Sequence, residues 1–403
     1  MAPPSFAMRV LISTHSRDVV GGAETYVKSV LPMLAARGHQ VALMHEIEAR
    51  PGGRLIDEGA ALDARISVEA ATGAARALEE ARAFRPDLVY QQGVAGLALE
   101  AALLELAPAI LFAHGYHGTC ISGSKRHAFP RYRACSRTLG AGCLLYYPLR
   151  RCGGLSLRTM MQHYAAQTAR REMLPRYRAV AVASEHMARE LSRHGASTRV
   201  VRYPPAWAPQ TSRPEPRAQR GVVLLAGRLT REKGVRQLAR AVEQAAAALG
   251  RQLVLRVAGA GPEEAWLRAR VPGRWSRIQL LGWLAPAELQ AQMREADVLA
   301  MPSVWPEPFG LSGIEAGGVG LPAVAYPVGG IPEWLEAGVG GELVEGAPAS
   351  VGALAAALVK VLQGPERWQA LREGAWRSAH RFSAQAHLEA LEPLLQSAIA
   401  GRS

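Results

Sequence analysis

Residues 298–301 read Val-Leu-Ala-Met, and residues 307–315 read Glu-Pro-Phe-Gly-Leu-Ser-Gly-Ile-Glu. The first run is short and apolar, as in a buried strand, and the second turns through glycines into a helix expected to begin at Ser312. Gly310 and Gly313 allow a ligand to approach the backbone closely. Because a helix start offers unbonded N–H groups and a positive dipole end, the turn suits an anion such as a diphosphate. The stretch therefore predicts a ligand site at the carboxyl end of a parallel strand.

The residues around this stretch alternate between strands and helices. Strands are predicted at Val222–Ala226, Leu253–Ala258, Ile278–Leu281, Val298–Met301 and Ala323–Tyr326. Helices are predicted at Val235–Ala248, Glu263–Arg270, Pro286–Arg294 and Ser312–Gly317, and from Val351 onward, with Ser383 as cap of the last helix. This alternation predicts a parallel sheet covered on both faces.

The first half of the chain has the same organisation. Strands are predicted at Val10–Ser13, Val41–His45, Leu88–Gln91, Ile110–His114 and Val180–Ser184. Helices are predicted at Tyr26–Ala36, Ala74–Phe84, Gly96–Leu106 and Glu185–His194. We therefore expect an α/β protein of two doubly wound, Rossmann-like domains that face a cleft.

Five prolines between Tyr203 and Gly221 interrupt the alternation and predict an interdomain linker. The expected organisation is an N-terminal domain at 1–203 with a cysteine-rich basic insert at 115–160, a linker at 204–220 and a C-terminal domain at 221–380. A final helix at 381–403 is expected to pack back toward the N-terminal domain.

The two glutamates of the opening stretch stand eight residues apart and flank its turn, where each carboxylate can accept paired hydroxyls. The stretch resembles the E-x7-E motif of glycosyltransferase family 4, a group of retaining enzymes with the two-domain GT-B fold. The resemblance implies that Glu307 binds the hydroxyls of the donor sugar and that Glu315 binds the ribose hydroxyls of the nucleotide. It also implies that the backbone at Phe309, Gly310 and Leu311 faces the diphosphate and the sugar.

Two further segments of the second half are similar to the same family. Arg228 and Lys233, in a loop between a predicted strand and a helix, resemble its diphosphate-binding cations. Fixed cations stabilise the negative charge that develops on a departing nucleoside diphosphate. Gly259 and Gly261, at the end of another predicted strand, resemble a glycine turn on the nucleotide side, although Gly-x-Gly alone is common.

In the first half, Gly21-Gly22-Ala23-Glu24 follows the first predicted strand. It resembles the family's glycine-rich loop, which implies donor phosphates at Gly21 and Gly22 and an acceptor-side position for Glu24. His114 ends a predicted strand and resembles the family histidine that contacts the donor sugar, and nearby His117 competes for that role on the acceptor side. The spaced glycines of a dinucleotide-binding fingerprint are absent, which argues against a nicotinamide dehydrogenase.

The resemblance implies a retaining transfer from a UDP- or GDP-sugar by front-face displacement, in which the departing phosphate takes the acceptor's proton and no metal serves catalysis. UDP-glucose, UDP-N-acetylglucosamine and GDP-mannose remain open as donors, and a polysaccharide, a lipid-linked glycan or a small metabolite as acceptor. The alternative is a catalytically idle sugar-nucleotide-binding protein. Phosphorylases and epimerases of related fold fit the sequence less well, because they lack this combination of motifs or need a larger chain.

All four cysteines lie in one stretch, at Cys120, Cys135, Cys143 and Cys152. Four soft ligands in a protein expected in the cytoplasm suggest a structural zinc site, although the usual C-x2-C pairs are absent. Buried thiols, a disulfide or an iron–sulfur site remain alternatives.

The net charge of +13 is concentrated around these cysteines. Between Cys120 and Arg178 twelve residues are Lys or Arg, and Glu172 is the only acid. Such a field attracts an anionic acceptor, and together with Tyr and Leu side chains it suits peripheral contact with a membrane. Packing of these apolar residues onto the domain is the simpler explanation. No nucleic-acid-binding signature is present. The start of the sequence does not resemble a signal peptide, so we expect a cytoplasmic protein that can also bind at the inner membrane face.

Overall fold

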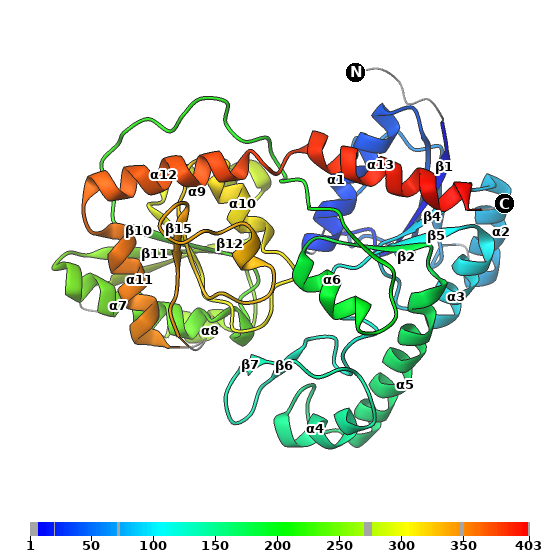
Figure 1. Cartoon of the computed structure of the whole chain (residues 1–403), viewed down its shortest axis with the longest axis horizontal. Coiled ribbons are helices and arrows are strands. Elements are labelled where there is room, and N and C mark those ends of the chain that lie inside the picture. Colours follow the sequence, from blue (N-terminus) through cyan, green and yellow to red (C-terminus); the bar gives the residue numbers. More distant parts are fainter. Residues whose placement is uncertain (1–6, 20, 71–72, 270–275, 347–349, 402–403) are drawn as a thin grey trace. The chain divides into compact units, whose positions relative to one another are not determined.

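The computed structural model describes residues 7–19, 21–70, 73–269, 276–346 and 350–401. The chain forms two compact units. Unit 1 comprises Met1–Ser124, Ser136–Ala206 and Ala384–Ser403, and unit 2 comprises Lys125–Cys135 and Trp207–Ser383. Each unit holds a parallel sheet with helices packed around it (Figure 1).

In the described residues, the sheet of unit 1 has seven parallel strands in the order β3-β2-β1-β4-β5-β8-β9. They are β1 (Arg9–Ser16), β2 (Gln40–Ile47), β3 (Ala64–Ser67), β4 (Leu88–Gln91), β5 (Ala109–Phe112), β8 (Ala179–Val182) and β9 (Thr198–Val200). Strands β4 and β8 are buried throughout, which requires cover on both faces and explains their apolar sequences. The strand order reverses between β1 and β4, where open α/β sheets bind ligands.

Helices from both ends of the chain cover this sheet. They are α1 (Gly22–Ala36), α2 (Ala74–Phe84), α3 (Leu97–Leu106), α4 (Gly142–Arg150), α5 (Leu157–Met173), α6 (Glu185–Ser192) and α13 (Ala384–Ala400), with the 3-10 turn η1 (Leu174–Arg176). The last helix, α13, contacts β4 and β5. Its His387 lies 3.2 Å from the Tyr26 hydroxyl of α1 and its Glu392 forms an ion pair with Arg37. The final helix thus belongs to unit 1, although the helix before it belongs to unit 2.

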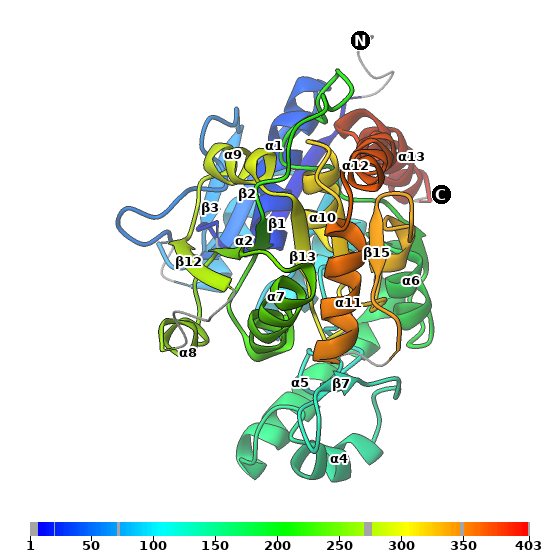
Figure 2. The same ribbon diagram turned by 90° about the vertical axis from the view of Figure 1, so that its left-hand side faces the viewer.

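The described sheet of unit 2 has six parallel strands in the order β12-β11-β10-β13-β14-β15. They are β10 (Val222–Ala226), β11 (Leu253–Ala258), β12 (Ser276–Gly282), β13 (Val298–Met301), β14 (Ala323–Ala325) and β15 (Gly341–Leu343). The helices are α7 (Val235–Leu249), α8 (Glu264–Arg268), α9 (Pro286–Glu295), α10 (Leu311–Gly317), α11 (Val351–Leu362) and α12 (Pro365–Ala379), with 3-10 turns η2 (Arg231–Lys233) and η3 (Ile331–Glu333). Helices α7 and α11 pack side by side (Figure 2). Here the strand order reverses between β10 and β13.

The proline-rich stretch expected as a linker is largely attached to unit 2. The carbonyl of Gln210 accepts a hydrogen bond from the Trp376 indole at 2.7 Å, and the carbonyl of Glu215 accepts one from Arg372 at 2.6 Å. Both donors lie on α12. Because helix side chains satisfy its backbone, most of the stretch from Trp207 onward is part of a folded unit.

The insert expected at 115–160 is divided between the units. Its Lys125–Cys135 part belongs to unit 2, where β6 (Arg126–His127) and β7 (Arg133–Ala134) form an antiparallel hairpin. The Arg126 guanidinium there lies 3.9 Å from the Glu232 carboxylate. The expectation that the whole insert belongs to the N-terminal domain is therefore wrong for the hairpin. Arg270, the expected end of α8, lies outside the described residues.

Candidate functional site

Lys233 and Glu307 meet at the strand-order reversal of unit 2. Lys233 ends the turn that follows β10, and Glu307 lies in the loop that follows β13. The Lys233 ammonium donates a hydrogen bond of 2.6 Å to Oε1 of Glu307. The structure thus brings together, from opposite sides of the reversal point, the residues predicted to hold the diphosphate and the donor sugar.

The same Glu307 oxygen is held by two further donors from its own loop. It accepts hydrogen bonds from the hydroxyl of Ser303 and, at 3.1 Å, from the indole N–H of Trp305. The Lys233 ammonium also lies 5.4 Å from the centre of the Trp305 ring, a distance at which the ring face attracts a cation. Glu307 is 5% exposed, so its carboxylate is fixed by these donors rather than by water.

Trp334 holds the loop between Glu307 and α10 in place. Its indole donates a 2.7 Å hydrogen bond to the carbonyl of Phe309, whose ring is buried and packs edge-on against Phe382. A Cβ at Gly313 would lie 2.0 Å from the Trp334 ring, so packing within the protein requires that glycine. Gly310 has a φ of 95° as the residue before α10, which favours glycine for conformational reasons.

The remaining predicted site residues of unit 2 lie in α10 and in the loops that follow β10 and β11. Leu311 begins α10, where the first N–H groups have no acceptor within the helix, and Glu315 is buried on the same helix. Arg228 is exposed, in the loop after β10. Gly259 and Gly261 follow β11, and a Cβ on them would lie 1.9 Å from the Gly227 carbonyl oxygen and 2.5 Å from that of Leu229. These two glycines therefore allow the loops after β10 and β11 to pack backbone against backbone.

In unit 1, the glycine-rich segment forms the start of α1. The Glu24 carboxylate accepts a 2.9 Å hydrogen bond from the Gly21 N–H, so it caps the helix. Gly22 has no positive φ, and a Cβ built on it would meet nothing within 4 Å. Neither backbone conformation nor packing within the protein requires glycine at 22, and the phosphate-facing role that the family resemblance implies for it stays a prediction.

His114 is enclosed by aromatic rings just beyond β5. Its ring stacks against Phe112 and Tyr203, and Tyr26 lies beside it. The Tyr203 hydroxyl lies 2.7 Å from Nδ1, and the side-chain oxygen of Gln92 lies 2.9 Å from Nε2. Since an amide oxygen only accepts, Nε2 carries the proton and Nδ1 accepts from Tyr203.

Burial lowers the pKa of His114 to about 3, so the ring is neutral at physiological pH. Both of its nitrogens are engaged within unit 1. Contact with a donor sugar, the role implied by the family resemblance, therefore requires one of these hydrogen bonds to be exchanged.

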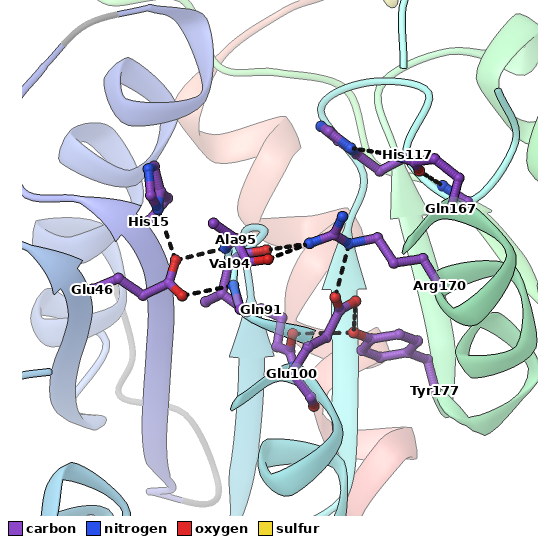
Figure 3. Close-up of polar contacts among 12 residues, drawn as sticks. His15, Glu46, Gln91, Val94, Ala95, Glu100, His117, Gln167, Arg170 and Tyr177 are labelled. Atoms are coloured by element: carbon purple, nitrogen blue, oxygen red, sulfur yellow. Dashed lines mark hydrogen bonds and ion pairs between the residues drawn. The ribbon is translucent and has the colours of Figure 1, made fainter. Parts of the chain in front are cut away.

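Figure 3 shows a polar network at the carboxyl end of the unit 1 sheet that the sequence analysis did not identify. Glu46, at the end of β2, accepts hydrogen bonds from the N–H groups of Ala95 and Gly96, which precede α3, and from Nδ1 of His15 at 2.7 Å. Nδ1 of His15 thus donates to the carboxylate and the half-exposed ring turns its other nitrogen away from Glu46. The pair joins β2 to the loop after β4, across the reversal point.

Arg170 of α5 fixes that loop from the other side. It donates to the carbonyls of Val94 and Ala95 at 2.9 and 2.8 Å and to the Glu100 carboxylate at 3.0 Å (Figure 3). Tyr177 donates a second 3.0 Å hydrogen bond to Glu100. Burial raises the pKa of Glu100, and the Arg170 guanidinium opposes this shift.

His117, the other predicted acceptor-side residue, lies at the edge of this network. Its Nδ1 is 3.5 Å from the amide nitrogen of Gln167, whose oxygen accepts from the Gly118 N–H at 2.7 Å. The sequence signal for the network was available: His15 and Glu46 are polar residues at the ends of apolar strands, where site residues of parallel sheets project.

The four cysteines do not form a metal centre in this structure. Among the described residues, which include all four, no three His, Cys, Asp or Glu side chains are arranged to hold a metal ion. Cys152 instead packs with Ile121, Leu139, Tyr147 and Met160 in a small apolar core beneath α4 and α5, and Cys143 lies against it. The zinc site predicted from Cys120, Cys135, Cys143 and Cys152 has no support in this geometry.

The whole chain is similar in fold to solved glycosyltransferase structures. That of Anabaena HepE in complex with UDP and glucose matches with a TM-score of 0.71 at 18% identity, covering 97% of this chain and 100% of that one. Sucrose-phosphate synthase from Thermosynechococcus elongatus matches with a TM-score of 0.69 at 18% identity, covering 98% and 100%. Two Rossmann-like domains of this kind define the GT-B fold, so the expected fold class is confirmed.

Sequence comparison gives the family. Residues 20–206 match the profile described as Glycosyltransferase Family 4, and residues 220–364 match that of Glycosyl transferases group 1. The 2-deoxystreptamine glucosyltransferase of Streptomyces kanamyceticus is 38% identical over 146 residues, which cover 36% of this chain and 37% of that protein. D-inositol 3-phosphate glycosyltransferase 1 of Catenulispora acidiphila is 35% identical over 191 residues, 45% of each chain.

The chain belongs to glycosyltransferase family 4. It spans less than half the length of these curated relatives. Across the described residues, every helix is too short or too polar to span a bilayer.

Proposed function

We propose that this protein is a retaining glycosyltransferase that transfers a hexose from a UDP- or GDP-sugar to an acceptor hydroxyl, without a catalytic metal. The observation that carries the proposal is the 2.6 Å contact of Lys233 with Glu307 at the reversal point of the unit 2 sheet. A cation that suits a diphosphate lies beside a carboxylate that suits sugar hydroxyls, which matches the order of groups in a nucleotide sugar.

The chemistry follows from these positions. As the bond between the sugar and the diphosphate breaks, negative charge grows on the phosphate oxygens, and Lys233 and the exposed Arg228 stabilise it. Glu307, fixed by Ser303 and Trp305, orients the sugar through its hydroxyls. In front-face displacement the departing phosphate takes the proton of the acceptor hydroxyl as the new glycosidic bond forms on the same face. Glu315 would hold the ribose.

We assign the acceptor to unit 1, near the His15–Glu46 pair. Glu46 fixes His15 through Nδ1, so that the other ring nitrogen, Nε2, is turned away from Glu46 and is available to a hydroxyl. A polysaccharide or lipid-linked glycan supplies such hydroxyls, and the cytoplasmic location expected from the sequence stays part of the proposal. UDP-glucose is the first donor to test, since the HepE structure contains UDP and glucose.

A thermal-shift screen of UDP, GDP and their sugars tests the donor. We expect one nucleotide sugar to raise the melting temperature by mass action, equally with and without EDTA. Release of nucleoside diphosphate from that sugar then tests turnover. Binding without release, across a panel of glycan acceptors, supports the idle sugar-nucleotide-binding alternative. A chain stabilised by no nucleotide or nucleotide sugar contradicts both.

A further inference from the structure

The outer side of the α4–α5 hairpin is unusually apolar for a surface. Five large apolar side chains there are 53–64% exposed: Leu145, Leu149, Leu155, Leu157 and Met161. They are five of the eight exposed large hydrophobic residues in the described parts of the chain, and they fall within 17 residues. We call this set the α4–α5 apolar face. Exposed apolar side chains gathered in this way mark interaction sites.

The apolar face is not needed to hold the hairpin together. The inner side has its own core, in which Tyr147 of α4 packs with Met160 of α5 and with Leu139. Leu145 and Leu149 are four residues apart, and so are Leu157 and Met161, so each pair lies on one side of its helix. The sequence analysis weighed packing onto the domain as the simplest explanation for these residues. Packing onto the domain explains the buried residues of the inner core, but it does not explain the five exposed residues of the apolar face.

Positive charge surrounds the apolar face without any acid nearby in sequence. Residues 106–171 contain no Asp or Glu, and Arg137, Arg150, Arg151 and Arg158 lie within or beside the two helices. The Arg137 guanidinium stacks 4.0 Å above the ring of Tyr146, which directs it along the helix surface. In Figures 1 and 2, α4 and the start of α5 lie at the end of unit 1 that is remote from its sheet.

We propose that the α4–α5 apolar face docks on an anionic lipid bilayer. Leucines inserted at the boundary of headgroups and acyl chains lose their contact with water, while the arginines meet lipid phosphates. A bilayer supplies both an apolar environment for the leucines and phosphate groups for the arginines. A second copy of this hairpin would place arginine against arginine, which makes self-association the poorer explanation. The docking does not depend on the transferase activity.

Vesicle flotation of the full chain tests the proposal. We expect it to float with phosphatidylcholine vesicles that contain 30% phosphatidylglycerol, to float poorly with phosphatidylcholine alone and to be released by salt. Leu145→Ser/Leu149→Ser should lower the partition coefficient at least about tenfold. Arg150→Gln/Arg158→Gln should lower it by about fivefold for each arginine. Ile47→Ser, which removes an apolar residue that is 45% exposed elsewhere in unit 1, should leave it unchanged.

Three results would overturn the proposal. One is the absence of flotation with acidic vesicles, and another is flotation that the paired leucine variant does not reduce. The third is a dimer in light scattering that the leucine variant converts to monomer, which would assign the face to self-association. Nucleotide-induced thermal shifts, measured on every variant, show that the variants are folded. They also separate failure of membrane docking from failure of the proposed activity.

Discussion

The ammonium of Lys233 lies 2.6 Å from the carboxylate of Glu307, although 74 residues separate them in sequence. The contact connects the loops that follow β10 and β13, the central pair of strands in unit 2. Each residue comes from a short local motif, and the sheet brings the two motifs together.

Replacing Lys233 with alanine should lower turnover about a hundredfold, because a fixed charge on the leaving diphosphate is lost. The fold should persist, since Glu307 keeps its hydrogen bonds from Ser303 and Trp305. Nucleotide release under saturating donor measures the effect. Lys360→Ala is the matched control, because Lys360 pairs with Glu342 at 2.8 Å on the other side of the same unit. Equal turnover in the two variants would remove the role assigned to Lys233.

Two glycine variants should separate ligand contact from packing. Gly22→Ala should leave the melting temperature nearly unchanged but weaken donor binding about tenfold, because a methyl group there meets only a ligand. Gly261→Ala should instead destabilise unit 2 by about 2 kcal/mol, since its φ is 155° and the added Cβ would lie 2.5 Å from the Leu229 oxygen. Urea denaturation and nucleotide titration measure both. Unchanged donor affinity in Gly22→Ala would argue against a phosphate-facing loop.

Arg170→Met should destabilise unit 1 by about 3 kcal/mol, because it leaves the buried Glu100 carboxylate without its cation. Adding Glu100→Gln to this variant should restore part of the lost stability. A simple packing defect at Arg170 would not be rescued in this way. Arg176→Met, which removes an exposed ion pair with Glu105, should change stability by less than about 1 kcal/mol. Urea midpoints followed by circular dichroism provide the comparison. No rescue in the double variant would show that the charge pair is not the cause.

Acid should destabilise unit 1 through His387. Burial lowers the pKa of this histidine to about 4, whereas an exposed histidine titrates near 6.5. The unfolded chain therefore binds the proton first, and stability falls as the pH drops from about 6.5 toward 4. Between pH 7.5 and 5 the loss amounts to about 2 kcal/mol from this site.

Melting curves across this pH range test the assignment. His387→Gln should reduce the loss of stability between pH 7.5 and 5 by about 2 kcal/mol, because its own proton uptake is removed, and should leave the part due to the buried His114. The exposed His163→Gln on α5 should keep the full dependence. Identical curves for His387→Gln and the wild type would show that other groups cause the acid sensitivity.

Most central strands could be predicted from sequence because they are buried on both faces and are continuously apolar. The missed strands β3, β9 and β15 are short, and each lies at the edge of its parallel sheet, while β6 and β7 of the hairpin were missed because each has only two residues. An edge strand is less buried, so Thr198–Val200 carries no apolar run that distinguishes it from a loop. Helix α5 was missed because polar residues dominate it and few of its positions are buried.

The sequence predicted those candidate site residues that lie in a recognisable local motif. Lys233 and Glu307 each follow a predicted strand, and their loops are recognisable without any knowledge of what lies beside them. The His15–Glu46 pair was missed because its meaning depends on the pairing of β1 with β2 and on the loop after β4. The roles of Lys233 and Glu307, like those of His114, Glu315 and Arg228, stay predictions. Among the described residues no three of the cysteines are arranged to hold a metal ion, and the zinc site stays a prediction from sequence.

Unit 1 is built from three separate stretches of chain, and α13 is the last of them. During synthesis a ribosome delivers the strands of unit 1 first and this helix only after the whole of unit 2. Until then the Tyr26 hydroxyl, which shares a 2.5 Å hydrogen bond with Tyr90, lacks the imidazole of His387, and β4 and β5 lack one of the helices that pack on them. The unit whose strands are synthesised first is therefore completed only after the whole of unit 2 has been synthesised.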